Sequence, residues 1–260
     1  RLRWPRRPPR PHAGGTRPRR APRRTPGPGP RVGALRSLSD VRGRRVTLPD
    51  VIPLFPLPNV VFFPGVPLPL HIFEPRYRAM VRDATAGSGL IGMVLLRGDW
   101  QPHYEAKDAP IFQVGTVGEA VRVEELPDGR FNLVLRGVRE FSVRDEPERG
   151  TPYRQANVDW GPASTDRVPA PVTARLVAQL EAYVRSLGGS GFAPPRLDDA
   201  EDDVLFVNGV AQQLDVSPLE KQALLEVQPL TARAARLSEV LAFRLAEQRG
   251  GGPGSSGQTH

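Results

Sequence analysis

The chain has 260 residues, 39% of them hydrophobic, which is enough to build one or two domains with a buried core. It contains no cysteine, which excludes disulfides, thiolate metal sites and cysteine nucleophiles, and fits a reducing compartment. No apolar run is long enough for a transmembrane helix, and no apolar signal-peptide core follows the N-terminal charges. We therefore expect a cytoplasmic protein that has no membrane partner.

The formal net charge of +8 is unevenly distributed along the chain. Residues 1–45 contain 15 arginines, nine prolines and one acidic residue, Asp40, so this segment carries a charge of +14. The other 215 residues contain 21 basic and 27 acidic side chains, a charge of −6. Because the basic segment has few apolar side chains to offset its ordering entropy, we expect residues 1–45 to form a disordered Arg/Pro-rich tail. The alternative is an arm that binds nucleic acid weakly, although Trp4 is the only Phe, Tyr or Trp that it offers for base stacking.

Residues 50–162 have the pattern of a β-rich subdomain with one inserted helix. The apolar segment from Ile52 to Leu57 contains prolines, and because proline cannot donate to a ladder hydrogen bond, we expect this strand at an edge of the sheet. Glu74-Pro75 predicts the start of the inserted helix, since proline suits the first helical turn. Further extended segments are predicted at Val60–Phe63, Val66–Phe73, Leu90–Leu96, Ile111–Glu124 (with bends at Gly115 and Gly118), Phe131–Val143 (with a break at Gly137) and Tyr153–Trp160.

Residues 168–248 have the 3.6-residue apolar period of a helical subdomain. Helices are predicted over residues 170–187, 202–214 and 231–248. Ser217-Pro-Leu-Glu220 is a complete capping box with proline in the first turn, so it marks the start of a further helix. The Gly/Ser-rich residues 249–260 are expected to form a second disordered tail.

Two lysines limit the catalytic chemistry that this chain can carry. A P-loop needs lysine after glycine to reach the nucleotide phosphates, but Lys107 follows Ala106 and Lys221 follows Glu220. A Ser–Lys dyad needs a lysine whose pKa is lowered by desolvation, and neither lysine has a sequence context that indicates it. We therefore expect no catalytic residues and no cofactor.

Candidate metal ligands are sparse as well. His71 and His103 are isolated and lack the spacing of zinc-binding motifs, so no metal site is predicted. Acidic residues cluster between Asp198 and Asp203. They either hold a divalent cation or cap the helix that follows, where negative charge is favourable; we prefer the capping interpretation.

The block from Ile52 to Arg78, IPLFPLPNVVFFPGVPLPLHIFEPRYR, resembles the opening of the N-terminal, substrate-binding domain of Lon proteases. Three later segments resemble further motifs of that family in the same order: Ile111–Val117, Gly129–Phe141 and Ser217–Glu226. One departure is Glu119, where the family pattern has a small apolar residue. The resemblance covers residues 50–248 and implies an α+β fold, in which a PUA-like β-pseudobarrel with one inserted helix is followed by a C-terminal α-helical bundle.

The resemblance also implies a function. In full-length Lon this domain captures unfolded or degron-bearing substrates ahead of an ATPase and a Ser–Lys peptidase. We expect a bacterial, free-standing, non-catalytic form that binds such polypeptides or a partner protein. The alternative is an RNA-binding PUA-like module, which the −6 charge of the folded part opposes because phosphate contacts dominate affinity.

The predicted binding site is an apolar groove beside the proline-containing strand. Its expected lining residues are Phe55, Leu57, Phe63 and Tyr77, and an extended peptide could add there as a strand. The alternative is that these large side chains belong to the core. Side-chain alternation predicts that Phe62 and Phe63 point to opposite faces, so one is exposed or covered by the helical region.

Overall fold

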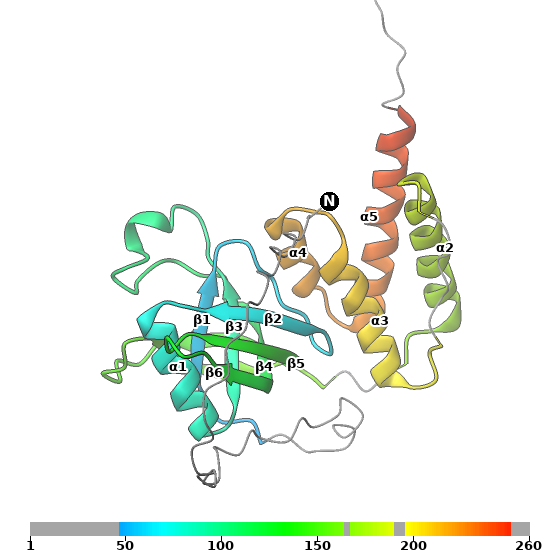
Figure 1. The fold of residues 1–260 in the computed structure, drawn as a ribbon. Helices are drawn as coiled ribbons and strands as arrows, with labels where there is room; N and C mark the ends of the chain where they lie inside the picture. The colour runs from blue at the N-terminus through cyan, green and yellow to red at the C-terminus, as the bar shows by residue number, and fades with distance from the viewer. Residues whose placement is uncertain (1–46, 164–166, 190–195, 251–260) are drawn as a thin grey trace, which may run out of the picture. The chain divides into compact units, whose positions relative to one another are not determined.

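The computed structural model describes residues 47–163, 167–189 and 196–250, which form a mixed β-sheet and five α-helices (Figure 1). The predicted tail over residues 1–45 lies outside these ranges. No helix within them is both long and apolar enough to cross a membrane. The elements in chain order are β1 (Val51–Leu57), β2 (Pro67–Ile72), α1 (Pro75–Ala86), β3 (Leu90–Leu95), η2 (Gln101–His103), β4 (Val114–Glu125), β5 (Phe131–Asp145), β6 (Arg154–Trp160), α2 (Ala170–Ser186), α3 (Ala200–Gln213), α4 (Pro218–Leu225) and α5 (Leu230–Gly250).

The strands form one sheet in the order β2-β5-β4-β3-β1-β6. β6 also pairs with β5, so the pairings of five strands close on themselves and β2 lies outside that ring. The 15-residue length of β5 makes this possible, because its first half pairs with β2 and its last residues pair with β6. The β1–β3 pair is parallel and the other pairs are antiparallel.

The prediction that the proline-containing strand β1 lies at an edge is wrong. Its first half, Val51 to Leu54, pairs with β6, and its second half, Leu54 to Leu57, pairs with β3. β1 is therefore an inner strand that changes its hydrogen-bonded partner at Leu54.

This change of partner explains how an inner strand accommodates prolines. Asp50 O accepts from Val158 N on the β6 side, and Leu57 O accepts from Leu96 N on the β3 side. Backbone groups of successive residues point to alternate sides of a strand. The nitrogen of Pro53 therefore faces the β3 side and that of Pro56 the β6 side. In each case the proline lies beyond the stretch that pairs on that side, so its missing N–H costs no ladder hydrogen bond.

Local irregularities differ in part from the sequence pattern. The residues from Val60 to Phe63 form a loop rather than a strand, and β5 continues through Gly137. The bend predicted at Gly118 coincides with a register shift between Val117 and Gly118. Just beyond it, Arg136 of β5 donates to Glu119 at 3.2 Å, which accommodates the acidic residue at this position.

Phe62 and Phe63 point to different clusters, as predicted, although they lie in a loop and not in a strand, and neither ring is exposed. Phe62 packs in a cluster with α1 and the sheet, whereas Phe63 packs in a cluster with the helices α2–α5. A third cluster, around Phe141, contains side chains from β1, β3, β4, β5 and β6. The loop between β1 and β2 thus connects the core of the sheet to that of the helical region.

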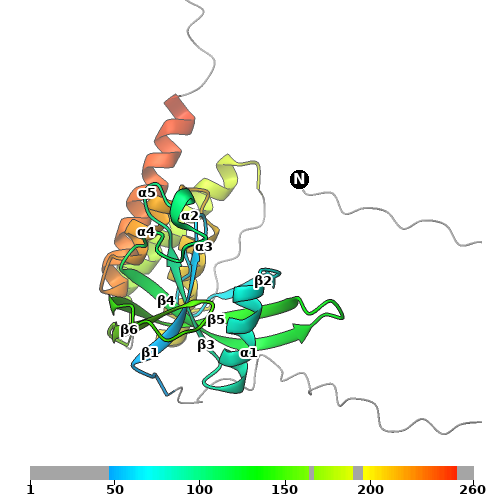
Figure 2. The same ribbon diagram turned by 90° about the vertical axis from the view of Figure 1, so that its left-hand side faces the viewer.

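The helices follow their sequence signals closely. Pro75 occupies the first turn of α1, and the capping box of α4 is present, with Ser217 N donating to Glu220 at 2.8 Å and Glu220 N to Ser217 Oγ at 3.2 Å. α2 lies along α5 in both views (Figure 1, Figure 2). The apolar stripe of α5 is buried over Ala234, Leu237, Leu241 and Leu245.

Candidate functional site

The four residues predicted to line a groove do not form one surface. Phe55, Leu57 and Tyr77 share one apolar cluster, in which the ring centroids of Phe55 and Tyr77 lie 4.4 Å apart. Phe63 belongs to the cluster of the helical region, and its side chain is fully buried. Phe55 and Tyr77 are also buried. This placement agrees with the alternative that these side chains belong to the core, and each side of β1 is paired with a neighbouring strand over half of its length.

Tyr77 takes part in a polar network that joins α1 to the long loop between β3 and β4. Arg76 donates to Glu74 through Nε at 3.0 Å and Nη2 at 2.9 Å, and through Nη1 to the Tyr104 carbonyl oxygen at 2.8 Å. The guanidinium also lies 4.3 Å from the Tyr104 ring centroid and 5.0 Å from that of Tyr77, within cation–π range. These contacts hold the loop against the start of α1.

The pKa shifts in this network indicate a structural role for its tyrosines and not a catalytic one. Burial raises the pKa of Tyr77 and of Tyr104, so both phenols stay protonated at neutral pH and neither serves as a base. The adjacent cavity, between Pro56, Tyr153 and the two tyrosines, measures about 10 Å³. That is room for one water molecule, so we assign no substrate site to it.

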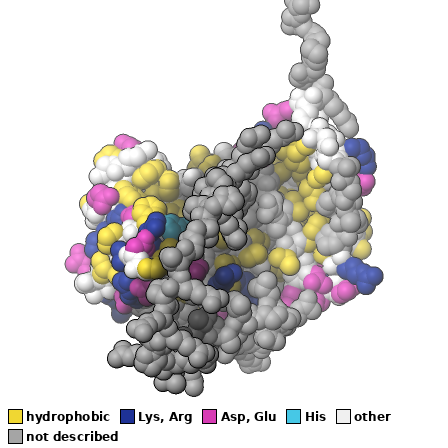
Figure 3. Space-filling view, viewed as in Figure 1, with side chains coloured by type: hydrophobic (Ala, Val, Ile, Leu, Met, Phe, Trp, Pro, Cys, Tyr) yellow, Lys and Arg dark blue, Asp and Glu magenta, His cyan; other side chains and the backbone are white. Residues whose placement is uncertain are grey.

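The largest exposed aromatic side chain of the strand region lies next to β2. Phe73 is 62% exposed and its ring stacks on His71 with centroids 6.4 Å apart. Pro67 and Pro69 are exposed on the same face, because residues two apart in a strand share a face. We call the exposed apolar residues along this strand the β2 strip; they are Pro67, Pro69 and Phe73, with half-buried Val134 opposite Pro69 on β5. We add Leu205 of α3, whose backbone lies against Gly65 just before β2. Figure 3 shows hydrophobic side chains on this view of the molecule, interspersed with charged ones.

A row of polar side chains crosses the sheet at His71, which lies between Pro69 and Phe73 on the exposed face of β2. Arg130 Nη1 donates to His71 Nε2 at 3.2 Å, so His71 Nδ1 carries the proton and donates to Asn132 Oδ1 at 2.8 Å. Asn132 in turn donates to Glu124 at 3.3 Å. The row fixes the His71 ring on which Phe73 stacks, and it places a polar group between Pro69 and Phe73.

The loop between β1 and β2 positions α3, and with it Leu205, at the end of the β2 strip. Asn208 Nδ2 donates to the Pro64 carbonyl oxygen at 3.0 Å, and Asn208 Oδ1 accepts from Arg233 at 2.6 Å. A Cβ on Gly65 would lie 3.3 Å from Val204 Cγ1 and 3.6 Å from the Leu205 Cα, so this loop lies against α3, and the φ of 80° at this position favours glycine. Leu205 itself is 48% exposed.

The two lysines occupy different environments. Lys107 Nζ is exposed and donates to the Thr151 carbonyl oxygen at 3.1 Å. Lys221 Nζ donates to the Gln212 carbonyl oxygen at 2.7 Å, and burial lowers the pKa of Lys221, which its sequence context did not indicate. The cause is tertiary, because α4 places this residue against the end of α3. Both ammonium groups thus donate to backbone carbonyl groups, not to a serine hydroxyl.

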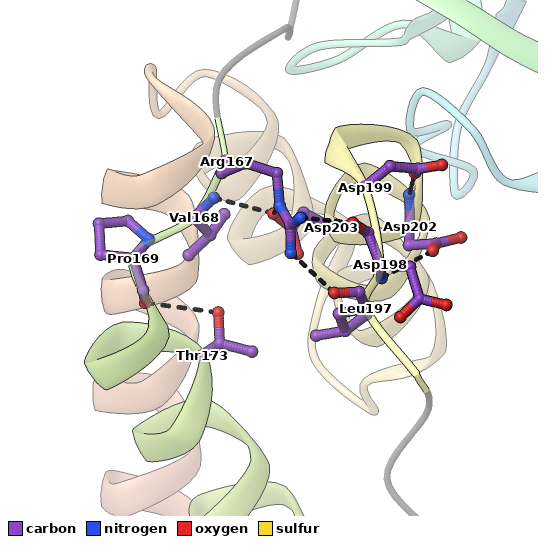
Figure 4. Close-up of polar contacts among 9 residues, drawn as sticks. All are labelled: Arg167, Val168, Pro169, Thr173, Leu197, Asp198, Asp199, Asp202 and Asp203. Carbon is purple, nitrogen blue, oxygen red and sulfur yellow. Dashed lines mark hydrogen bonds and ion pairs between the residues drawn. The ribbon is translucent and has the colours of Figure 1, made fainter.

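The acidic cluster before α3 caps the helix and anchors a linker (Figure 4). Asp199 accepts from Asp202 N at 2.9 Å as the N-cap residue. The buried carboxylate of Asp203 accepts from Arg167 Nε at 2.7 Å and from Val168 N at 2.9 Å. The capping interpretation therefore holds for Asp199. Nowhere in the described ranges are three His, Asp or Glu side chains grouped to hold a metal ion.

Sequence reasoning missed the exposed residues of the β2 strip. The signal was present, because Pro67, Pro69 and Phe73 alternate with the inward Leu68, Leu70 and Ile72 in a segment predicted to be extended. Leu205 gave no such signal, since its position beside Gly65 depends on a contact between distant parts of the chain.

Known proteins with similar sequences place this chain in a family. Residues 51–242 match the family model described as the ATP-dependent protease La (LON) substrate-binding domain. The Lon protease of Flavobacterium johnsoniae is 30% identical over 194 residues, which cover 72% of this chain and 23% of that protein. The Lon protease of Parabacteroides distasonis is 30% identical over 203 residues, which cover 74% of this chain and 24% of that protein. The chain thus spans about a quarter of the length of these curated relatives.

Solved structures agree with this match. The Lon N-terminal domain protein from Xanthomonas campestris is 26% identical, with a TM-score of 0.54 over 74% of this chain and 98% of that chain. The N-terminal domain of a Mycobacterium avium complex Lon protease is 16% identical, with a TM-score of 0.53 over the same shares, and shows likeness of fold alone. Because the family model covers well over half of the sequence, the chain belongs to the Lon substrate-binding domain family.

Proposed function

We propose that this chain binds extended apolar segments of unfolded or degron-bearing polypeptides along the β2 strip. The observation that carries the proposal is the exposure of Phe73, 62%, beside two exposed prolines on a strand at the edge of the sheet. Exposed apolar surface bordered by polar residues commonly marks an interaction site. The family name supports the same role, since the matched model describes a substrate-binding domain.

We further propose that binding is not coupled to catalysis within this chain, and that it takes place in the cytoplasm. The match is confined to the substrate-binding domain, and both lysines donate to backbone carbonyl groups. We also propose that residues 50–162 form a PUA-like β-pseudobarrel and residues 168–248 a helical bundle. On this proposal the sheet presents the β2 strip, while α3 contributes Leu205 at its end.

A matched pair of phenylalanines tests the proposed site. Phe73 beside β2 and Phe243 on α5 are each 62% exposed, so their replacement by serine changes the same amount of apolar surface. We expect Phe73→Ser to weaken binding of fluorescently labelled casein about tenfold, with an unchanged melting temperature. Phe243→Ser should bind as the wild type does. Equal affinities for all three proteins would reject the β2 strip as the site.

A binding measurement with RNA tests the alternative function. The −6 charge of residues 46–260 opposes phosphate binding. A single-stranded RNA probe, measured against the same protein without residues 1–45, should show no binding at physiological salt. RNA binding by this shortened protein that competes with casein would contradict the proposal.

A further inference from the structure

β2 lies at a free edge of the sheet, because β5 is the one strand that pairs with it in the described part of the chain. The pair is antiparallel and runs from Pro67 opposite Arg136 to Ile72 opposite Phe131. The outer edge of β2 is therefore available to a further strand unless its backbone groups prevent pairing.

The hydrogen bond of Val66 fixes which backbone groups point outward. The Val66 carbonyl oxygen accepts from Gly137 N of β5 at 3.0 Å, so this group faces β5. Because successive residues point to opposite sides of a strand, Pro67, Pro69 and His71 direct their backbone groups to the outer edge. Proline has no N–H, so this edge presents three carbonyl groups but one N–H group, that of His71.

We infer that Pro67 and Pro69 prevent strand addition at β2, so that the β2 strip takes an extended apolar segment of an unfolded polypeptide without forming a β-ladder with it. In an antiparallel ladder each hydrogen-bonded residue both donates and accepts. Opposite the two prolines a bound segment can donate its N–H groups, but its own carbonyl groups meet no donor. The identity of the bound segment rests on the proposed function.

Such a one-sided edge suits a surface that meets unfolded chains. A complete free edge adds further strands, from a client or from a second copy of the chain, and this leads to aggregation. The prolines remove the donors while their exposed rings remain available for apolar contact beside Phe73. A bound segment is then held by side-chain contacts and a few hydrogen bonds, and it can leave again.

The test restores both donors with the variant Pro67→Val/Pro69→Val. Valine keeps an apolar side chain and favours strands. Pro102→Val, at an exposed proline of η2 outside the sheet, is the control. The probe is a fluorescent peptide of alternating valine and threonine, about eight residues long, which is enough to span β2. Its affinity is measured by anisotropy, and self-association of the protein by sedimentation equilibrium.

Two restored ladder hydrogen bonds should tighten peptide binding about tenfold, and the double variant should self-associate more strongly than the wild type and Pro102→Val. Unchanged peptide affinity together with unchanged self-association of a folded double variant would overturn the inference. If the wild type binds no peptide but the double variant self-associates, the proposed function fails and the inference about the edge stands. If the double variant does not fold by circular dichroism, Pro69→Val alone restores one donor, with an expected gain of about threefold.

Discussion

The guanidinium of Arg233 on α5 donates to Glu140 Oε1 on β5 at 2.8 Å, although 93 residues separate the two in sequence. The Arg233 side chain is 1% exposed and that of Glu140 11%. The same guanidinium donates to Asn208 of α3 and to the Leu225 carbonyl oxygen at the end of α4. One buried cation therefore connects the sheet to three helices, including the helix that carries Leu205.

Removing this cation should destabilise the protein strongly. Arg233→Met leaves the Glu140 carboxylate largely buried without its partner, and we expect the free energy of unfolding to fall by about 3–5 kcal/mol. Urea denaturation measures the change. The double variant Arg233→Met/Glu140→Leu should recover part of the loss, because it removes the unpaired charge.

The control for this prediction is an exposed pair on the same helix. Arg236 donates to Glu239 at 2.8 Å, with 60% and 57% of the side chains exposed. Arg236→Met should cost less than about 1 kcal/mol, since exposed pairs are screened by solvent. Equal losses for the two arginine variants would show that the buried pair does not hold the helical region to the sheet.

Gly137 offers a second test of the same junction. A Cβ at this position would lie 2.2 Å from the Phe63 carbonyl oxygen and 2.8 Å from the Pro64 Cα. No side chain fits without moving the loop between β1 and β2. Gly137→Ala should therefore lower the free energy of unfolding by about 2 kcal/mol or more, as measured by denaturation.

Gly209 in α3 is the matched control. Nothing lies within 4 Å of the Cβ that alanine would add there. Alanine is favoured over glycine inside a helix, so Gly209→Ala should raise the free energy of unfolding by about 0.5–1 kcal/mol. A neutral Gly137→Ala variant would mean that the loop shifts freely and does not fix α3.

The local sequence pattern predicted much of this fold, because helix starts and strand alternation depend on residues that are close together in the sequence. The capping box at Ser217 and the helix start at Pro75 both depend on short spacings. The edge prediction for β1 was wrong for a definite reason. A proline shows that a backbone N–H donor is missing on one side of the strand. The sequence does not show whether the neighbouring strand on that side ends before it reaches the proline.

The candidate site depended on contacts that no local pattern contains. Among the described residues β2 pairs with β5 alone, and the outer edge that this leaves follows from the topology of the whole sheet. The Arg233–Glu140 pair and the burial of Lys221 likewise arise where distant elements pack together. The predicted groove residues lie in two separate apolar clusters, and this separation depends on how the sheet and the helices pack together.

A tyrosine links stability to high pH. Tyr153 donates to Asp83 at 2.7 Å, and burial raises the pKa of Tyr153 to about 12. In an unfolded chain the pKa of tyrosine is about 10. The unfolded chain thus loses this proton first, so the stabilisation is fully present below about pH 10 and is lost as the pH rises to about 12.

Tyr153→Phe should flatten the fall in the free energy of unfolding between about pH 10 and 12, by about 1–3 kcal/mol. The measurement is urea denaturation across this range. The control is Tyr183→Phe, at a half-buried tyrosine of α2. Its free energy of unfolding should fall over this pH range as that of the wild type does. Parallel curves for Tyr153→Phe and the wild type would show that another group governs alkaline unfolding.

The chain should be catalytically silent. Purified protein is expected to hydrolyse no ATP and to cleave no casein, because neither lysine follows a glycine and both donate to backbone carbonyl groups. Phosphate release and gel analysis measure the two activities. Activity that disappears in Lys107→Gln or Lys221→Gln, but not in an Arg97→Gln control, would contradict this prediction.

Phe63 and Phe73 should separate stability from binding. Phe63 is fully buried, with the Arg233 guanidinium carbon 5.6 Å from its ring centroid, whereas Phe73 is 62% exposed. Phe63→Ala should lower the free energy of unfolding by about 3–5 kcal/mol through the cavity that it leaves. Phe73→Ala should lower it by less than about 0.5 kcal/mol.

Casein binding of the same two variants is measured at a temperature where both are folded by circular dichroism. We expect Phe63→Ala to bind casein as the wild type does, because its ring does not reach the surface, and Phe73→Ala to bind more weakly. The reverse result, with Phe63→Ala stable but weak in binding, would return the site to the apolar groove beside β1 that the sequence predicted. It would also mean that the loop between β1 and β2 opens in solution to expose Phe63, and Gly137→Ala, which displaces that loop, should then alter casein affinity as well as stability.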